Sequence, residues 1–370
     1  MNASVDMFMA SSIMVLLVLA SFYGITEVSE IYWGRSPEGL LERGREVGRY
    51  LLLSPGEPAD WGVETSGAPT HLGLAEEGSD RPYKLNIDKV SRLRSGGRYA
   101  LTYSQLWEAL GVKDLSFRIE LETLFDVSLS LSSAEDLGSE TRYTFQIHTS
   151  MGGLPLSVDV KWYALVRDYI ASGSSSTDGG GEGTVSLTFP NSLSGSALLV
   201  VLARTGSDLL SFGVLQFGHR AQEPRPNGSY LTLTPLNYTL YVDANYPGES
   251  LIGARVLTYN YEFNLTEKGE GAYAIPRLLD PSPMVLVVTG VNGTEYFAEW
   301  VSYPPVPLEV RAGMEPDYSV SGVSSAEYLV EVAGVLYRVR VSVRRPAVSY
   351  THLRAHETSL HLVCRLLLEK

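Results

Sequence analysis

Residues 116–121, SFRIEL, and residues 127–131, VSLSL, alternate between apolar and polar side chains. A period of two is typical of a β-strand with one buried and one wet face. Residues 143–147, YTFQI, repeat the pattern, whereas residues 197–203, ALLVVLA, are apolar throughout and indicate a buried strand. These stretches predict a mainly β protein.

Changes in composition divide the 370 residues into six segments. We expect a small α+β module followed by two β-sandwich-like, immunoglobulin-like domains. The expected segments are a transmembrane and spine helix over 1–53, a Pro/Gly-rich loop over 54–82, the α+β module over 83–150, a β domain over 151–220, a β-sandwich-like domain over 221–347, and a non-native tail over 348–370.

Residues 7–26, MFMASSIMVLLVLASFYGIT, carry no charge. A helix of that length is about 30 Å long, the thickness of the hydrocarbon core of a bilayer. A buried core helix and a cleaved secretory signal are the alternatives. The second lacks a charged n-region, because Asp6 is the only charge before the run. We therefore expect a retained single-pass anchor in the cell membrane.

The orientation of the anchor rests on two opposing signals. Arg35, Arg43, Arg45 and Arg49 follow the run and, by the positive-inside rule, favour a cytoplasmic location for that side. The rest of the chain has the composition of an extracellular region and carries Asn-x-Ser/Thr acceptors for glycosylation. The acceptors in its second half are Asn227, Asn237, Asn264 and Asn292. We expect the bulk of the chain to be extracellular and glycosylated.

The segment after the anchor predicts a second helix and a pinned loop. Ser36 followed by Pro37 is a helix start signal, and Ser54-Pro55-Gly56 ends the helix. In the loop that follows, Trp61 is the only large anchor, so we expect it to pack against the neighbouring domain. Asn86 is the expected N-cap of a short helix.

Charge and cysteine content exclude several classes of protein. A net charge of −13 argues against non-specific nucleic-acid binding, and one cysteine excludes a disulfide framework. No nucleophile elbow, zinc motif, dinucleotide fingerprint or calcium loop occurs. Outside the tail, His71, His148 and His219 are expected to be solvated or capping residues. We predict no catalytic residue, no metal site and no cofactor.

Two groups of side chains keep other functions open. Carboxylates such as Glu120, Glu122 and Asp126 are compatible with a glycosidase pair, although solvated strand faces explain them. An aromatic strip is compatible with sugar stacking, although sandwich core plus surface tyrosines explains it too. The aromatic residues are Tyr259, Tyr261, Phe263, Tyr296, Phe297 and Trp300.

The composition changes abruptly after Pro346. Residues 348–370 contain Cys364 and the pair His352 and His356, whose i, i+4 spacing is also compatible with a metal site. The segment resembles a translated sequencing-adaptor tail, so we expect it not to be native.

Two stretches carry a resemblance to a known family. Residues 3–8, ASVDMF, lead directly into the apolar run, and residues 51–62, LLLSPGEPADWG, precede GLA at 73–75 and LNIDKV at 85–90. Together they resemble archaeal type IV pilin-like, membrane-anchored surface proteins over about residues 1–121. The resemblance implies that Asp6 is the acidic residue that pairs with a neighbour's N-terminal amine during assembly. The basic leader with its Lys/Arg-Gly cleavage site is absent from the sequence, which predicts either an upstream start or an unprocessed relative.

These observations predict a non-enzymatic envelope protein that is pilin-like or adhesive. Its expected partners are the membrane, through residues 7–26, and further copies of itself, through the N-terminal helix. A membrane-anchored carbohydrate- or solute-binding protein is the first alternative, and a secreted hydrolase is the second.

Overall fold

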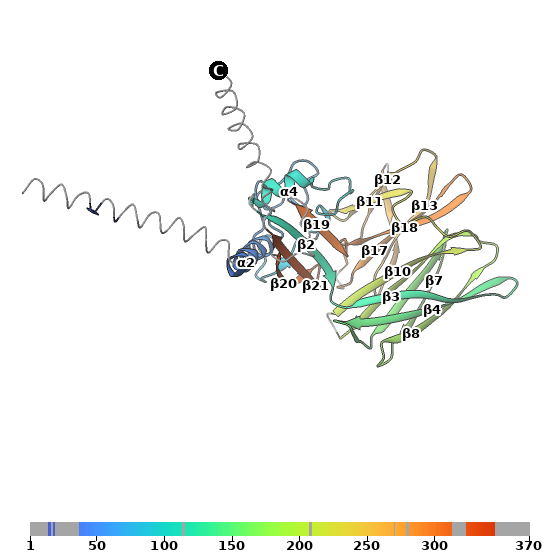
Figure 1. Ribbon diagram of the computed structural model, residues 1–370. Coiled ribbons are helices and arrows are strands. Elements are labelled where there is room, and N and C mark those ends of the chain that lie inside the picture. Colours follow the sequence, from blue (N-terminus) through green and yellow to red (C-terminus); the bar gives the residue numbers. More distant parts are fainter. Residues whose placement is uncertain are drawn as a thin grey trace, which may run out of the picture.

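The computed structural model describes residues 14, 15, 18, 37–112, 115–206, 209–269, 271–278, 281–312 and 323–344 (Figure 1). Within these residues the chain is mainly β, which confirms the predicted class. None of the helices found there is long and apolar enough to cross a bilayer. Asp6, most of the run 7–26 and the whole of the tail 348–370, with its histidines and Cys364, lie outside the described residues.

A five-stranded sheet joins the two ends of the chain. Its order is β1-β20-β21-β2-β19. The strands are β1 (Lys84–Leu85), β20 (Val323–Val332), β21 (Val335–Arg344), β2 (Ser116–Thr123) and β19 (Leu308–Ala312). Only the pairing of β1 with β20 is parallel. The expected boundaries are wrong here, because one sheet contains strands from both the predicted 83–150 module and the predicted 221–347 domain.

Helix α2 (Pro37–Leu53) covers one face of this sheet at the end occupied by β20 and β21 (Figure 1). It starts at the predicted Pro37, and its buried face includes Leu40, Val47 and Leu51. Gly48 permits a close approach, since a Cβ there would lie 2.7 Å from the hydroxyl oxygen of Tyr328. The helix is therefore part of the folded body rather than a separate spine.

Two short helices, α3 (Ile87–Ser91) and α4 (Tyr103–Leu110), complete the N-terminal module. Asn86 is the N-cap of α3, as predicted, and its side chain accepts hydrogen bonds from the backbone N–H groups of Asp88 and Lys89. A capping box begins α4, where Thr102 is the N-cap and Gln105 its partner.

Three further sheets stack in layers beyond this module, and all are antiparallel. The outer sheet contains β3 (Asp126–Asp136), β4 (Glu140–Met151), β5 (Leu154–Pro155) and β8 (Glu182–Pro190). The middle sheet contains β6 (Asp159–Val166), β7 (Tyr169–Ser176), β9 (Gly195–Thr205) and β10 (Leu209–His219). The third contains β13 (Glu249–Leu257), β14 (Glu262–Asn264), β17 (Met284–Asn292) and β18 (Glu295–Tyr303).

The middle sheet is buried on both faces, which explains the apolar run in β9. Leu199 and Val201 pack with the outer sheet, whereas Leu198, Val200 and Leu202 pack with the third sheet. The boundary predicted at residue 220 therefore does not separate two cores, because one sheet belongs to both. The boundary predicted at residue 150 falls within β4.

A smaller four-stranded sheet lies between the third sheet and the N-terminal module. It consists of β11 (Leu231–Leu236), β12 (Thr239–Ala244), β15 (Thr266–Gly269) and β16 (Ala272–Ala274). Its apolar side chains, including Leu233 and Leu240, join the same core as α2, β2 and β21. The third sheet, the smaller sheet and the N-terminal module thus share one continuous core.

Candidate functional site

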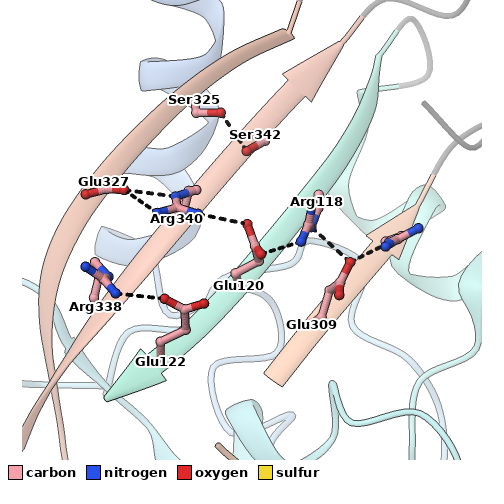
Figure 2. Close-up of polar contacts among 10 residues, drawn as sticks. Arg118, Glu120, Glu122, Glu309, Ser325, Glu327, Arg338, Arg340 and Ser342 are labelled. Atoms are coloured by element: carbon pink, nitrogen blue, oxygen red, sulfur yellow. Dashed lines mark hydrogen bonds and ion pairs between the residues drawn. The ribbon is translucent and has the colours of Figure 1, made fainter. Parts of the chain in front are cut away.

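The face of the five-stranded sheet opposite to α2 carries a network of charged side chains (Figure 2). Alternation along β2 places Phe117, Ile119 and Leu121 in the core, so the intervening Arg118, Glu120 and Glu122 lie on the opposite face. Neighbouring strands add charges in the same rows. They are Glu309 and Arg311 on β19, Glu327 on β20, and Arg338 and Arg340 on β21.

The network pairs each acid with at least one arginine. Arg340 lies 2.7 Å from Glu327 and 3.8 Å from Glu120, and Arg338 lies 3.0 Å from Glu122. Arg118 bridges Glu120 and Glu309, at 2.9 Å from the latter. Glu120 and Glu309 stand directly opposite each other, so this arginine offsets the repulsion between two carboxylates on adjacent strands.

Within this network four glutamates balance four arginines, and ion pairs join them to one another. Glu120 and Glu122 each bind a different arginine, so the network uses both in ion pairs rather than as an acid and base pair. Asp126 lies on β3, in a different sheet. We interpret the face as a solvated sheet surface that its own charges stabilise.

The motif at residues 51–62 has a structural explanation. Trp61 is fully buried, and its indole Nε1 donates a hydrogen bond to the carbonyl oxygen of Gly73 at 3.0 Å. A Cβ at Gly73 would lie 2.3 Å from the carbonyl oxygen of Ser54, so only glycine fits this crossing of two loop segments. The structure thus places Trp61 as an anchor of the loop.

Two buried cations complete the attachment of this loop. Lys89 on α3 is 1% exposed, and its Nζ donates to the carbonyl oxygens of Pro55 at 2.7 Å and Ala75 at 2.9 Å. Arg92 follows α3 and donates to the carbonyl oxygens of Trp61 and Gly67. Burial lowers the pKa of Lys89 to about 8, and nearby acidic side chains oppose the shift. The sequence did not predict that Lys89 and Arg92 are buried, because solvent-exposed helices carry Lys and Arg as well.

A buried acid connects the same helix to the layered body. The Oδ1 atom of Asp88 accepts hydrogen bonds from the Tyr303 hydroxyl and from the backbone N–H of Asn237, both at 2.6 Å. Asp88 is 5% exposed, and burial raises its pKa while these hydrogen bonds oppose the shift. Asp88 also lines a cavity of about 540 Å³ between the module and the body. A buried, perturbed acid in a cleft is the strongest candidate for a functional site in the described part of the chain.

The histidines occupy three different environments. His219 is fully buried at the end of β10, which corrects its expected position in a solvated loop. Its Nε2 donates to the carbonyl oxygen of Pro190, so its Nδ1 accepts from the hydroxyl of Tyr143 at 2.9 Å. Burial lowers its pKa, which fits a neutral core residue. His71 and His148 are exposed and lie next to Glu57 and Glu182, respectively.

The predicted glycosylation acceptors differ in accessibility. Asn264 and Asn237 are exposed, and Asn292 is half-buried. Asn227 uses both ends of its amide, donating to the carbonyl oxygen of Trp300 and accepting from its N–H, both at 2.9 Å. Modification of Asn227 would break this pair, so Asn264 is the better acceptor.

The aromatic residues do not form one strip. Phe297 is in the core, stacked on Tyr230 with ring centroids 4.6 Å apart. Tyr261 and Phe263 form an exposed stacked pair on the β14 edge. Arginine side chains cover the rings of Tyr259 and Tyr296, and Trp300 packs edge-on against Phe212. The interpretation as core plus surface residues describes this arrangement better than a continuous sugar platform.

In the part of the chain that the structure describes, no group of three or more His, Cys, Asp or Glu side chains is placed to hold a metal ion. No family model and no curated protein matches this chain. Among solved structures, HBP35 of Porphyromonas gingivalis is similar at 11% sequence identity with a TM-score of 0.19. The match covers 48% of this chain and 63% of that protein. A TM-score this low carries no argument about fold or function.

Proposed function

We propose that this chain is a non-enzymatic surface protein of the cell envelope, pilin-like or adhesive, held in the membrane by residues 7–26. One observation supports this proposal above the others. Helix α2 begins at Pro37, eleven positions after the end of the apolar run at residue 26, and lies at one end of the molecule, whereas β3, β4 and β8 lie at the opposite end (Figure 1). An anchor attached before α2 would present the layered sheets away from the membrane.

Three of the four arginines after the run do not oppose this orientation. Arg43, Arg45 and Arg49 are exposed on α2, which packs on a sheet built from both ends of the chain. The positive-inside rule applies to short loops, because folded domains and long segments translocate largely regardless of charge. These arginines are part of a folded module, so their sign does not oppose an extracellular location.

Membrane fractionation of cells that express the full chain tests the anchor. We expect the protein to sediment with membranes, to resist an alkaline wash and to be released by detergent. Leu16→Arg with Leu19→Arg adds about 5–7 kcal/mol to insertion at the bilayer centre and is expected to abolish this behaviour. Tyr50→Arg with Leu53→Arg adds the same charge at exposed positions of α2 and serves as the control.

Protease treatment of intact cells tests the orientation. We expect proteinase K to degrade the described domain without lysis. Degradation only after lysis would contradict the extracellular location, and equal membrane association of the two double variants would contradict the anchor.

Assembly through the N-terminal helix is the pilin-like part of the proposal. A carboxylate placed near lipid needs a compensating charge, and a neighbour's N-terminal amine would supply it to Asp6. Asp6→Ala is expected to reduce cross-linked oligomers in the membrane fraction, with Asp6→Glu retaining them. Unchanged cross-linking in Asp6→Ala would leave an anchored protein that does not assemble in this way.

A further inference from the structure

The cavity beside Asp88 lies where four parts of the fold meet. Residues around α3 form one wall, and the turns between β11 and β12 and between β20 and β21 form two others. The segment between β16 and β17 completes the lining with Arg277, Leu278 and Pro281. The cavity volume of about 540 Å³ is within the range of small-ligand sites. Lining residues from the turns are Asn237, Tyr238, Ala333 and Gly334, each with positive φ. Two-residue turns of this kind are tightly defined, so these walls are pre-formed.

Most charges around the cavity already have partners. Lys84 pairs with Glu76 at 2.8 Å, and Glu331 pairs with Arg81 at 3.3 Å. These pairs are complete within the protein and leave no net charge for a ligand.

Two lining residues of opposite charge, Asp88 and Arg277, are not paired in this way. The Asp88 side chain uses Oδ1 for both of its hydrogen bonds, and Oδ2 accepts none from any residue that the structure describes. The guanidinium of Arg277 lies 4.6 Å from the ring centroid of Tyr238 and makes no hydrogen bond or ion pair within the described ranges. Asp88 and Arg277 do not form an ion pair with each other, although the positive charge of Arg277 opposes the rise in the pKa of Asp88.

We propose that this cavity binds a small zwitterion of the amino-acid or short-peptide class, with its ammonium group on Asp88 Oδ2 and its carboxylate on Arg277. A guanidinium matches a carboxylate with two parallel hydrogen bonds, and the Tyr238 ring beneath Arg277 holds the guanidinium plane in place. A ligand with a single charge is attracted by one residue and repelled by the other. A ligand that carries both charges can pair with both residues. The distance between the two charges of the ligand is therefore the basis of recognition.

The volume distinguishes this ligand class from a bare ion. A cavity of about 540 Å³ holds more than one amino acid, so a chain of two or three residues fits as well as a free amino acid. The proposed ligand site does not depend on the proposed membrane anchor.

Calorimetric titration of the purified full chain in detergent tests the proposal. The probes are glycine, diglycine and triglycine, which carry the same two charges at increasing separation. We expect at least one of them to bind, and the best length to report whether the ligand is an amino acid or a peptide. The matching N-acetylated and C-amidated compounds lack one charge each and are expected to bind at least about tenfold more weakly.

Three variants assign the contacts. Arg277→Gln removes an exposed guanidinium and is expected to weaken the best probe about tenfold or more, with the amidated probe unaffected. Asp88→Asn keeps an oxygen that can accept from Tyr303 and removes the charge, so it is expected to weaken binding of the ammonium group. Arg81→Gln, an exposed arginine that is already paired with Glu331, is the matched control and is expected to change nothing.

Two results would overturn the proposal. The first is no heat of binding for any of the three probes up to about 10 mM, a concentration at which even weak small-molecule binding is measurable. The second is binding that Arg277→Gln leaves unchanged. Because Arg277 is exposed and makes no hydrogen bond or ion pair within the described ranges, that second result does not depend on whether Asp88→Asn folds.

Discussion

Replacing Tyr303 by Phe tests the link between the N-terminal module and the layered body. The Tyr303 ring is fully buried at the end of β18, and its hydroxyl donates to Asp88 Oδ1 at 2.6 Å. The substitution removes one oxygen atom and keeps the shape of the ring. It leaves Asp88, which is 5% exposed, with a single hydrogen bond from the N–H of Asn237.

The size of the effect follows from the charge and burial of the acceptor. A hydrogen bond to a charged group contributes about 1.5–3 kcal/mol, because the buried carboxylate cannot recover the bond from water. The unfolding entropy is about 2.1 cal/mol/K per residue, so in a chain of this length each kcal/mol lowers Tm by about 1.5 °C. We therefore expect Tyr303→Phe to lower Tm by roughly 2–5 °C.

A second tyrosine provides the matched control. Tyr337 on β21 is also fully buried, but its hydroxyl has no hydrogen-bond partner among the described residues. Burying an unpaired hydroxyl costs free energy, so Tyr337→Phe is expected to leave stability unchanged or to raise it. Thermal and urea unfolding of both variants, followed by near-UV circular dichroism, measures the difference.

A double-mutant cycle with Asp88→Ala isolates the pair, because alanine has no oxygen that can accept from Tyr303. If the hydrogen bond is the cause, the losses from Tyr303→Phe and Asp88→Ala are not additive. Equal changes in Tyr303→Phe and Tyr337→Phe, or full additivity in the cycle, would refute the reasoning.

Three further predictions concern the loop, the acceptors and the alkaline limit of stability. Gly73→Ala is expected to destabilise by about 1–3 kcal/mol because its Cβ meets fixed backbone, whereas Gly253→Ala, where a Cβ meets nothing within 4 Å, changes little in urea unfolding. In a host that glycosylates Asn-x-Ser/Thr, Asn264→Gln is expected to remove a mass shift on mass spectrometry; a loss with Asn227→Gln instead would contradict the assignment. Burial raises the pKa of Tyr163 to about 12, so its contribution to stability is present below the unfolded pKa of about 10 and is lost as the pH rises through 12. Urea midpoints that stay constant from pH 9 to pH 12 would contradict that sign.

Local pattern predicted local structure well. The alternation at residues 116–121 and 143–147 identified β2 and part of β4, and the start signal at Pro37 identified α2. These predictions succeeded because backbone geometry fixes which side chains share a face within one element. Trp61 was predicted to be buried for a different reason. A large aromatic side chain in a polar loop gains most by packing.

The candidate site was not predictable in the same way. Asp88, Lys89 and Arg92 fall within one short helical segment and have the composition of a solvated surface. Each is buried because a distant segment supplies its partner, as Tyr303 does for Asp88 across 215 positions. A charged residue within a helix carries no signal of a partner that far away in the sequence.

By itself the sequence determined the strands, the amphipathic helix and the charge-free run, because each depends on the spacing of residues that are close along the chain. Only the tertiary structure decided that β2 pairs with β21, that the middle sheet belongs to two cores, and that Asp88 and Arg277 line one cavity. The physical reason is that periodicity shows which side chains must leave water, while long-range pairing and packing select the surface that covers them.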